Sequence, residues 1–220
     1  MRMYNPEWES IRHSDLTSSF TDLQFDLEGH SIPADHGQSL HDALLACLPE
    51  LGDLAELGVH PVTGAPSGID DNDTLLLNRR TKLFLRLPSE HVEQAKKLSG
   101  CHLETRVGPL KIGSAKLRPL LPFAELHSPL VILNGGEELG FMEEARQLLG
   151  SLGIQGVGLI CNKRRTISTA DGEASGFGLM IHGLSPAQSL LLQERGLGTM
   201  HERGCGVFVP HKSVKEVVLD

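Results

Sequence analysis

Apolar and polar positions in the first half of the chain change period several times, from the alternation of a strand to the spacing of a helix. Leu23, Phe25 and Leu27 alternate with polar residues, which is typical of a half-buried strand. Leu40, Ala43, Leu44 and Cys47 recur at helical spacing. The elements predicted for this half are a strand at 20–28, a helix at 38–48, strands at 58–62 and 81–87, a helix at 89–98 and a strand at 101–107.

The second half repeats this order of elements. One helix has a strong start signal, with Ser185 as N-cap, Pro186 at the first helical position and Gln188 as the partner in a capping box. That helix stops at Gly196. The predicted elements are a strand at 125–133, a helix at 137–149, strands at 154–161 and 176–182, a helix at 187–195 and a strand at 206–209, which 214–219 would extend.

Two consecutive β-α-β-β-α-β units predict an α+β protein with two tandem ferredoxin-like (RRM-like) domains. We expect a flexible N-terminal segment at 1–19, a first domain at 20–115 and a second domain at 116–220. The joint is expected within the stretch 108–122, which Gly and Pro interrupt. A glycine-rich loop at 196–206 then connects the second helix of the second domain to its last strand.

Composition narrows the class of protein. Hydrophobic residues make up 40% of the 220 residues, and no apolar run approaches the roughly 20 residues that a membrane-spanning helix needs. The N-terminus does not resemble a secretory signal, so we expect a cytoplasmic protein with reduced thiols and no membrane partner. The four cysteines, which lie far apart in the sequence, form no Cys-x-x-Cys pair. We therefore expect no metal site and no cofactor.

The glycine-rich loop is the most specific feature of the chain. Gly196, Gly198, Gly204 and Gly206 form two Gly-x-Gly pairs around a short polar segment. Glycine allows positive φ angles and close backbone approach, which suits contact with a phosphodiester chain. We expect a valine at Gly198 or Gly204 to weaken RNA binding while the fold persists.

One basic cluster lies at 162–165 and further basic residues lie within 195–215, in and around this loop, although the net charge of the chain is −8. The first 110 residues carry the whole acidic excess, and the remaining 110 are balanced. Local fields govern phosphate attraction more than the global charge does. The same residues are also compatible with ordinary solvated turns. Besides the four glycines, the candidate RNA-binding residues are Lys163, Arg164, Arg165, His201, Arg203, His211 and Lys212.

The tandem domains and the loop pattern G-h-G-x5-G-x-G-h-F, where h is a hydrophobic residue, resemble the repeat-associated RNA-binding superfamily of CRISPR systems. More narrowly, the chain resembles the sixth CRISPR-associated (Cas) protein family, the endoribonucleases that process precursor CRISPR RNA (crRNA), and within it the Myxococcus-type branch. The resemblance runs from about residue 22 to near the end of the chain. Besides the glycine-rich loop, the segments that carry it are 32–37, 58–64, 78–81, 83–88, 163–166, 182–186 and 204–213.

This resemblance implies that the protein cleaves CRISPR repeat RNA without a metal. The 2′-hydroxyl of the RNA attacks the scissile phosphate, and the cleavage leaves a 2′,3′-cyclic phosphate. Histidine suits the proton transfers because its ordinary pKa is about 6.5. The resemblance places the catalytic histidine in or just after the first helix. His41 lies in a Leu-His-x-x-Leu turn, and His36 lies in an Asp-His-Gly segment that matches the Myxococcus-type branch. We expect His36 or His41 to be catalytic with the other in support, and His60 is a third candidate.

Two other functions remain open at this point. The chain could be a non-catalytic subunit that holds the repeat hairpin, with other Cas subunits of a class 1 effector complex as partners. It could also be an unrelated ferredoxin-like metabolic or regulatory domain. The second of these does not account for a glycine-rich loop with flanking basic residues. Cleavage of a labelled repeat RNA in EDTA separates an enzyme from a binding subunit.

Overall fold

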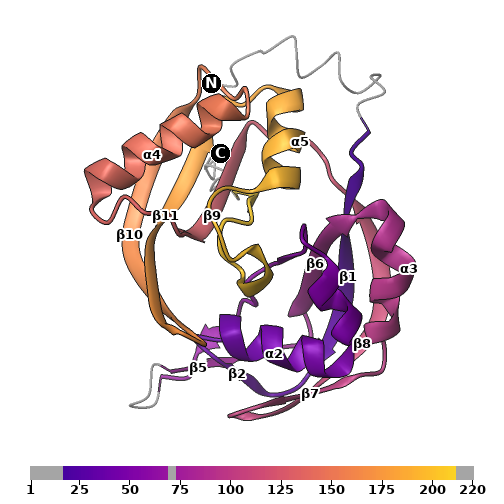
Figure 1. Ribbon diagram of the computed structural model, residues 1–220. Helices are drawn as coiled ribbons and strands as arrows, with labels where there is room; N and C mark the ends of the chain where they lie inside the picture. Colours follow the sequence, from indigo (N-terminus) through magenta and orange to yellow (C-terminus); the bar gives the residue numbers. More distant parts are fainter. Residues whose placement is uncertain (1–16, 69–72, 212–220) are drawn as a thin grey trace, which may run out of the picture.

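The computed structural model describes residues 17–68 and 73–211, and its first half is a five-stranded antiparallel sheet (Figure 1). The strand order is β3-β6-β1-β8-β7. Without the outer strand β7, this is the order of a ferredoxin-like sheet, with the first strand between the third and the fourth. The strands are β1 (Phe20–Glu28), β3 (Gly58–Val59), β6 (Lys82–Pro88), β7 (His102–Thr105) and β8 (Gly108–Pro119).

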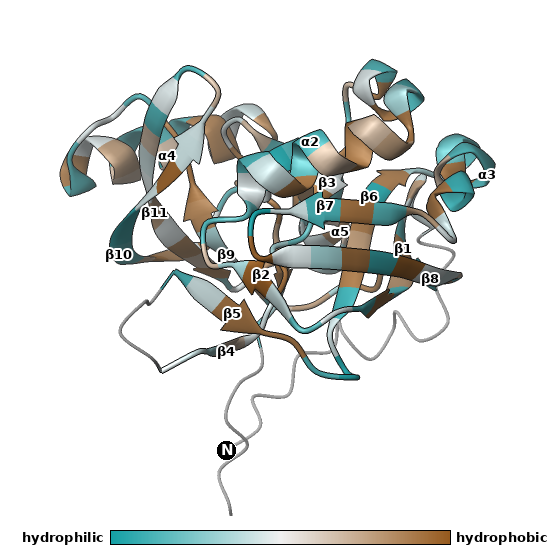
Figure 2. Cartoon of the chain, turned by 90° about the horizontal axis from the view of Figure 1, so that it is seen from below, coloured by the Kyte–Doolittle hydropathy of each residue, from teal (hydrophilic) through white to brown (hydrophobic). Residues whose placement is uncertain are grey.

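Helices pack against this sheet because the chain alternates its apolar side chains toward one core. Leu23 and Phe25 of β1 and Leu85 of β6 are fully buried, and they pack with Leu40 and Leu44 of the first helix. Outward faces of α2 and α3 carry hydrophilic residues (Figure 2). The helical segments are α2 (Gly37–Cys47), η2 (Pro49–Asp53), η3 (Ser89–His91), α3 (Val92–Ala95) and η4 (Lys96–Leu98).

The stretch 108–119 corrects the sequence analysis. It was expected to belong to the joint, but it forms β8, the fourth strand of the ferredoxin-like sheet, which pairs with β1. The strand predicted at 101–107 is the shorter β7, which pairs only with β8 at the sheet edge. Gly113 lies within β8, next to the register shift between β1 and β8. A Cβ at this position would lie 2.9 Å from the Cβ of Asp26, so the close approach of the two strands requires a glycine here.

The second half is a four-stranded antiparallel sheet in the order β10-β11-β9-β12, again the ferredoxin-like order. The capping box of α5 is confirmed, because the Ser185 side chain accepts from the Gln188 backbone N–H and the Gln188 side chain accepts from the Ser185 backbone N–H. Phe141, Ile181 and Phe208 are buried in the core. The elements are β9 (Glu125–Val131), α4 (Glu138–Ser151), β10 (Gly158–Thr169), β11 (Gly172–His182), α5 (Pro186–Arg195), η5 (His201–Arg203) and β12 (Val209–Pro210).

Two features of the strands differ from the prediction. The β10–β11 hairpin is longer than the predicted strands and curves from the second half toward α2 and β5 (Figure 1). A small antiparallel sheet, which was not predicted, consists of β2 (Ser31–Pro33), β5 (Thr74–Leu76) and β4 (Ala65–Pro66). Figure 2 shows it beside the large sheet. Most of the predicted N-terminal segment and the stretch 214–219 lie outside the described residues.

The two halves are joined by a buried arginine. Arg86 of β6 is 3% exposed, and its Nε and Nη2 donate to the two carboxylate oxygens of Asp22 at 2.8 and 2.9 Å. Its Nη1 donates to the carbonyl oxygens of Gln193 and Phe208 in the second half, at 3.1 and 2.6 Å. Although burial alone raises the pKa of Asp22, His60 and Arg86 together hold that pKa well below its usual range.

Candidate functional site: the cleft between the two halves

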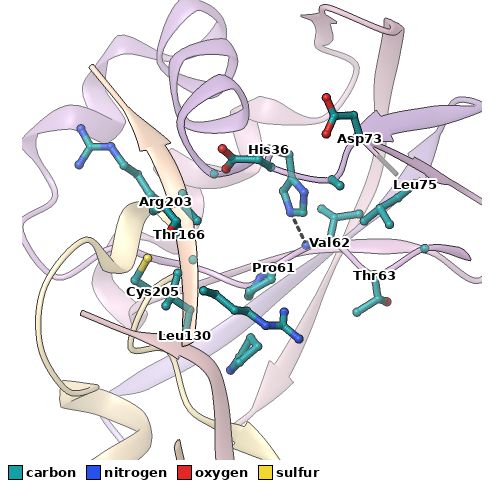
Figure 3. Close-up of a pocket in the computed structure, with 18 residues that line it drawn as sticks. His36, Pro61, Val62, Thr63, Asp73, Leu75, Leu130, Thr166, Arg203 and Cys205 are labelled. Carbon is teal, nitrogen blue, oxygen red and sulfur yellow. Dashed lines mark hydrogen bonds between the residues drawn. The ribbon is translucent and has the colours of Figure 1, made fainter. Parts of the chain in front are cut away.

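A cleft of about 580 Å³ lies between the two halves of the molecule (Figure 3). From the first half, segments 34–37 and 61–64 line it. From the second half, residues 165–167 of β10 and residues 203–205 of the glycine-rich loop line it. The cleft therefore collects several of the segments that the sequence analysis singled out, from both halves.

The two walls of the cleft are held together at the start of α2. The Asp35 Oδ2 atom accepts a hydrogen bond from the Ser168 N–H at 2.7 Å, and the Gln38 Oε1 atom accepts one from the Ala170 N–H at 3.2 Å. These bonds tie the tip of the β10–β11 hairpin to the N-terminal end of α2, where Asp35 precedes the helix and Gln38 lies in its first turn. Gly37 is needed there because a Cβ on it would lie 2.6 Å from the Arg203 carbonyl oxygen.

His36 has a structural position in this wall. Its Nε2 accepts a hydrogen bond from the Val62 N–H at 2.9 Å, shown as the dashed line in Figure 3, and its Nδ1 lies 3.0 Å from the Pro33 carbonyl oxygen. This pairing is that of a neutral ring with its proton on Nδ1. Burial lowers the pKa of His36. Both ring nitrogens are thus engaged in holding the 61–64 segment against the N-terminal end of α2.

His41 lies on the same helix but is placed differently. Helical spacing puts it on the face of α2 that carries Gly37 and Gln38, both of which contact Arg203. Its side chain is 16% exposed, and Nδ1 lies 3.4 Å from Asp42 Oδ1. No described residue is hydrogen-bonded to its Nε2. His41 therefore has a ring nitrogen available for proton exchange, which His36 does not.

Arg203 is the cation of the glycine-rich loop at this contact. Its Nε donates to Gln38 Oε1 at 2.8 Å, and its Nη1 donates to Glu202 Oε1. Within the part of the chain that the structure describes, nothing accepts a hydrogen bond from Nη2. The Arg203 side chain is 21% exposed. A fixed, partly exposed guanidinium with a spare donor is suited to a phosphate oxygen.

The glycines of the loop pack against the protein itself. All four have positive φ angles: +63° at Gly196, +82° at Gly198, +88° at Gly204 and +64° at Gly206. A Cβ on Gly198 would clash with the Ile132 carbonyl oxygen, and one on Gly206 would clash with the carbonyl oxygen of Leu197. The structure does not support the expectation that valine at Gly198 leaves the fold intact.

His201 fills the centre of this loop. A Cβ on Gly196 would lie 2.8 Å from its Nε2, and one on Gly206 would lie 2.9 Å from the same atom. Burial lowers the pKa of His201. The ring is thus enclosed by the loop glycines. The third candidate, His60, is also enclosed: it stacks on Phe84, and its Nε2 lies 3.3 Å from Asp22 Oδ1.

The basic cluster Lys163, Arg164 and Arg165 lies on the exposed edge strand β10 rather than in a turn. Arg165 lines the cleft and also a second hollow of about 260 Å³, which Lys163 and His211 line with it. Arg164 lies 3.8 Å from Glu137. A line of cations therefore runs from the cleft onto the sheet. The predicted residue Lys212 lies outside the described residues.

Sequence reasoning missed Asp35, which lines the cleft, and Gln38, which lies beside it on α2. Asp35 was quoted only as part of an Asp-His-Gly segment, and nothing marked Gln38, a polar residue in the first turn of a helix. Among the described residues, no group of three or more His, Cys, Asp or Glu side chains could hold a metal ion. No helix in the described parts is both long and apolar enough to cross a membrane.

Solved structures of CRISPR-associated proteins have this fold. The structure of the product of a Cas6-related gene from Pyrococcus furiosus superposes with a TM-score of 0.64, at 14% identity, over 90% of this chain and 99% of that one. A structure described as a RAMP protein binding different RNA substrates gives 0.58, at 11% identity, over 86% and 98%. The two ferredoxin-like halves thus define the chain as a protein with the tandem fold of CRISPR-associated RAMP structures.

Sequence comparison identifies the family. The model of the Cas6 Crispr family matches residues 21–213. The CRISPR-associated endonuclease Cas6 of Myxococcus xanthus (strain DK1622) is 33% identical over 192 residues, which are 87% of this chain and 81% of that protein. The chain belongs to the Cas6 family.

Proposed function

We propose that this protein is a metal-independent endoribonuclease that binds CRISPR repeat RNA and cleaves precursor crRNA. In this reaction the 2′-oxygen next to the scissile phosphate bonds to phosphorus, and the bond from phosphorus to the 5′-oxygen breaks. The 2′-hydroxyl loses a proton, the leaving 5′-oxygen gains one, and a 2′,3′-cyclic phosphate remains. The product passes to other Cas subunits of a class 1 effector complex in the cytoplasm.

The observation that carries this proposal is the contact between α2 and the glycine-rich loop. There, His41 lies on the helix face that contacts Arg203. Gln38 holds the Arg203 guanidinium, whose Nη2 has no acceptor among residues 17–68 and 73–211. Arg203 neutralises the phosphorane, and His41 moves a proton to or from one of the two reacting oxygens. His36 supports the site by fixing the 61–64 wall. The Cas6 endonuclease of Myxococcus xanthus supports the activity as a relative.

RNA reaches this centre along the cationic edge of the second half. Lys163, Arg165 and His211 line the hollow that adjoins the cleft, and Arg164 lies on the same strand. Arg165 lines both the cleft and the adjoining hollow, so an RNA strand that leaves the cleft meets this residue first. The loop glycines and His201 act through the shape of the loop that carries Arg203, and Lys212 follows His211 in the sequence.

The test is cleavage of a labelled repeat RNA in excess EDTA, followed by analysis of the product ends. We expect a 2′,3′-cyclic phosphate or the 3′-phosphate that it opens to, and no cleavage when the nucleotide upstream of the cut is 2′-deoxy. His41→Ala should lower the cleavage rate by about 10²–10⁴ with little change in RNA affinity. Cleavage of the 2′-deoxy RNA would contradict the proposed chemistry, and RNA binding without cleavage would indicate a holding subunit.

A second substrate identifies which proton His41 moves. A bridging sulfur in place of the 5′-oxygen leaves without protonation, so it compensates for a missing general acid but not for a missing general base. His91→Ala is the matched control, because His91 is a histidine of the first half that lies on the 3₁₀ turn η3 beside Glu90, outside both α2 and the glycine-rich loop. Equal activity of the His41→Ala and wild-type proteins would remove His41 from the mechanism.

A further inference from the structure

The hollow of about 260 Å³ beside the cleft lies on the second sheet and has a basic lining. Among the described residues that line it, none is Asp or Glu. Lys163 and Arg165 are exposed there, and neither forms an ion pair with any described residue. The other basic members of the lining are His127 of β9 and His211, which follows β12. Two unpaired cations in one hollow attract an anion.

His127 and His211 form a ring pair within this hollow. Their ring centroids lie 5.3 Å apart, and the two rings are perpendicular. His211 is exposed and His127 is half-buried, so a ligand in the hollow can reach both side chains. Burial and the neighbouring His211 lower the pKa of His127, which favours its neutral ring. A neutral imidazole has one N–H donor, whereas the protonated ring has two and carries a charge.

The charges around the ring pair determine when it takes up a proton. From β10, Lys163 and Arg165 disfavour a further positive charge in the hollow. From β9, Glu125 lies two residues before His127 on the same side of the sheet, where β11 places His182 opposite it. Neither Glu125 nor His182 lines the hollow, and β12 contributes no titratable side chain. An anion that binds in the hollow reverses the balance, because it favours the charged imidazole.

We propose that this hollow binds a backbone phosphate of the RNA strand that leaves the cleft, and that the His127–His211 pair takes up a proton from solvent when the phosphate binds. Lys163 and Arg165 attract the phosphate at every pH, and the ring pair adds a contribution that grows as the pH falls. Arg165 lines both the cleft and this hollow, so one strand can occupy both. This inference rests on the proposed function, because that function places the RNA strand in the cleft.

The experiment measures the Kd of the full-length protein for a repeat RNA with a 2′-deoxy nucleotide at the cut, by fluorescence anisotropy at pH 6 and pH 8. We expect the ratio of Kd at pH 8 to Kd at pH 6 to be about 10-fold larger for wild type than for His127→Gln/His211→Gln, as for one added charge-assisted hydrogen bond. His182→Gln is the matched control and should keep the wild-type ratio, because its ring lies against Gly158 at the start of β10, outside the hollow.

Melting temperatures at both pH values show whether the variants are folded. If the double variant unfolds, the single variant His211→Gln, at an exposed residue, makes the same comparison. The salt dependence gives a second readout. At pH 6, the slope of log Kd against log salt concentration should be steeper for wild type than for the double variant by about one phosphate contact.

A substrate-side measurement identifies the group that the rings contact. A methylphosphonate removes the charge of a single phosphate, and at one position beyond the scissile phosphate it should abolish the difference between wild type and the double variant. Equal pH ratios in these two proteins, or an equal loss in His182→Gln, would overturn this inference alone. A difference that survives methylphosphonate at every position would place a base against the rings and overturn it too. Absence of cleavage of the unmodified repeat RNA by wild type would instead overturn the proposed function.

Discussion

Removal of the Arg86 guanidinium should destabilise the protein more than removal of any single surface charge. Arg86→Met keeps the length of the side chain but removes four hydrogen bonds, two to Asp22 and one each to the carbonyl oxygens of Gln193 and Phe208. The variant leaves the largely buried Asp22 carboxylate without its guanidinium partner and two carbonyl groups without a donor. Loss of one partner from a buried ion pair costs about 3–5 kcal/mol.

The assay is thermal and urea unfolding of wild type and variant. For a protein of this size, each kcal/mol shifts the melting temperature by about 2–4 °C, so Arg86→Met should lower it by about 6–20 °C. Arg195→Met is the matched control, because Arg195 also makes an ion pair between the halves, with Glu56 at 2.8 Å, but both side chains are about half exposed. That pair should contribute about 0–1 kcal/mol.

The pH dependence gives an independent check on the same reasoning. The pKa of Asp22 is held below its ordinary value, so the folded protein keeps the carboxylate charged where the unfolded chain is protonated. The stabilisation of the folded protein by the Asp22 carboxylate is complete above the pKa of about 4 that an aspartate has in the unfolded chain. It is lost as the pH falls toward the lower pKa that Asp22 has in the folded protein. Arg86→Met should weaken this acid dependence. Equal stability losses in Arg86→Met and Arg195→Met would refute the assignment of Arg86 as the buried link.

Two further predictions concern stability. Gly198→Ala should lower the melting temperature by several degrees more than Gly153→Ala. Both positions have positive φ angles, but only a Cβ at position 198 would press against a backbone oxygen, that of Ile132. Equal losses in the two variants would show that the loop can move aside. Burial lowers the pKa values of His36 and His60, so the unfolded chain takes up protons first and stability should fall as the pH drops below about 6.5. Melting temperatures measured between pH 7.5 and 5.5 check this, and a flat profile would contradict it.

Elements with a strong local signal could be predicted from the sequence. The strand at 20–28 matches β1 residue for residue, because alternation of apolar side chains is enough to define a half-buried strand. The start of α5 was also correct, since its capping box is a local interaction between Ser185 and Gln188. β8 was missed because Gly113 and the flanking prolines are typical of a linker. The close approach of Asp26, which requires that glycine, is a tertiary contact.

The same distinction applies to the site. Sequence could name His36 and His41 as candidates but could not choose between them, because the choice depends on the partners of the ring nitrogens. Val62, which engages His36, lies 26 residues away. Residues 162–169 contain a single apolar residue, Ile167, and so show no alternation. The contact of this hairpin with the start of α2 depends on Asp35 and Gln38, more than 130 residues away.

The glycine-rich loop therefore contributes to the site through geometry rather than through exposed backbone. Its positive φ angles and the enclosed ring of His201 fix the turn that carries Arg203. The carbonyl oxygen of Arg203 then packs against Gly37, and its guanidinium is held by Gln38. Because His41 lies on that same face of α2, the conformation of the loop sets the separation between Arg203 and His41, the proposed proton-transfer group. Under the proposed function, a change in the loop should therefore alter the cleavage rate by moving one of these groups relative to the other, even where no loop glycine contacts RNA.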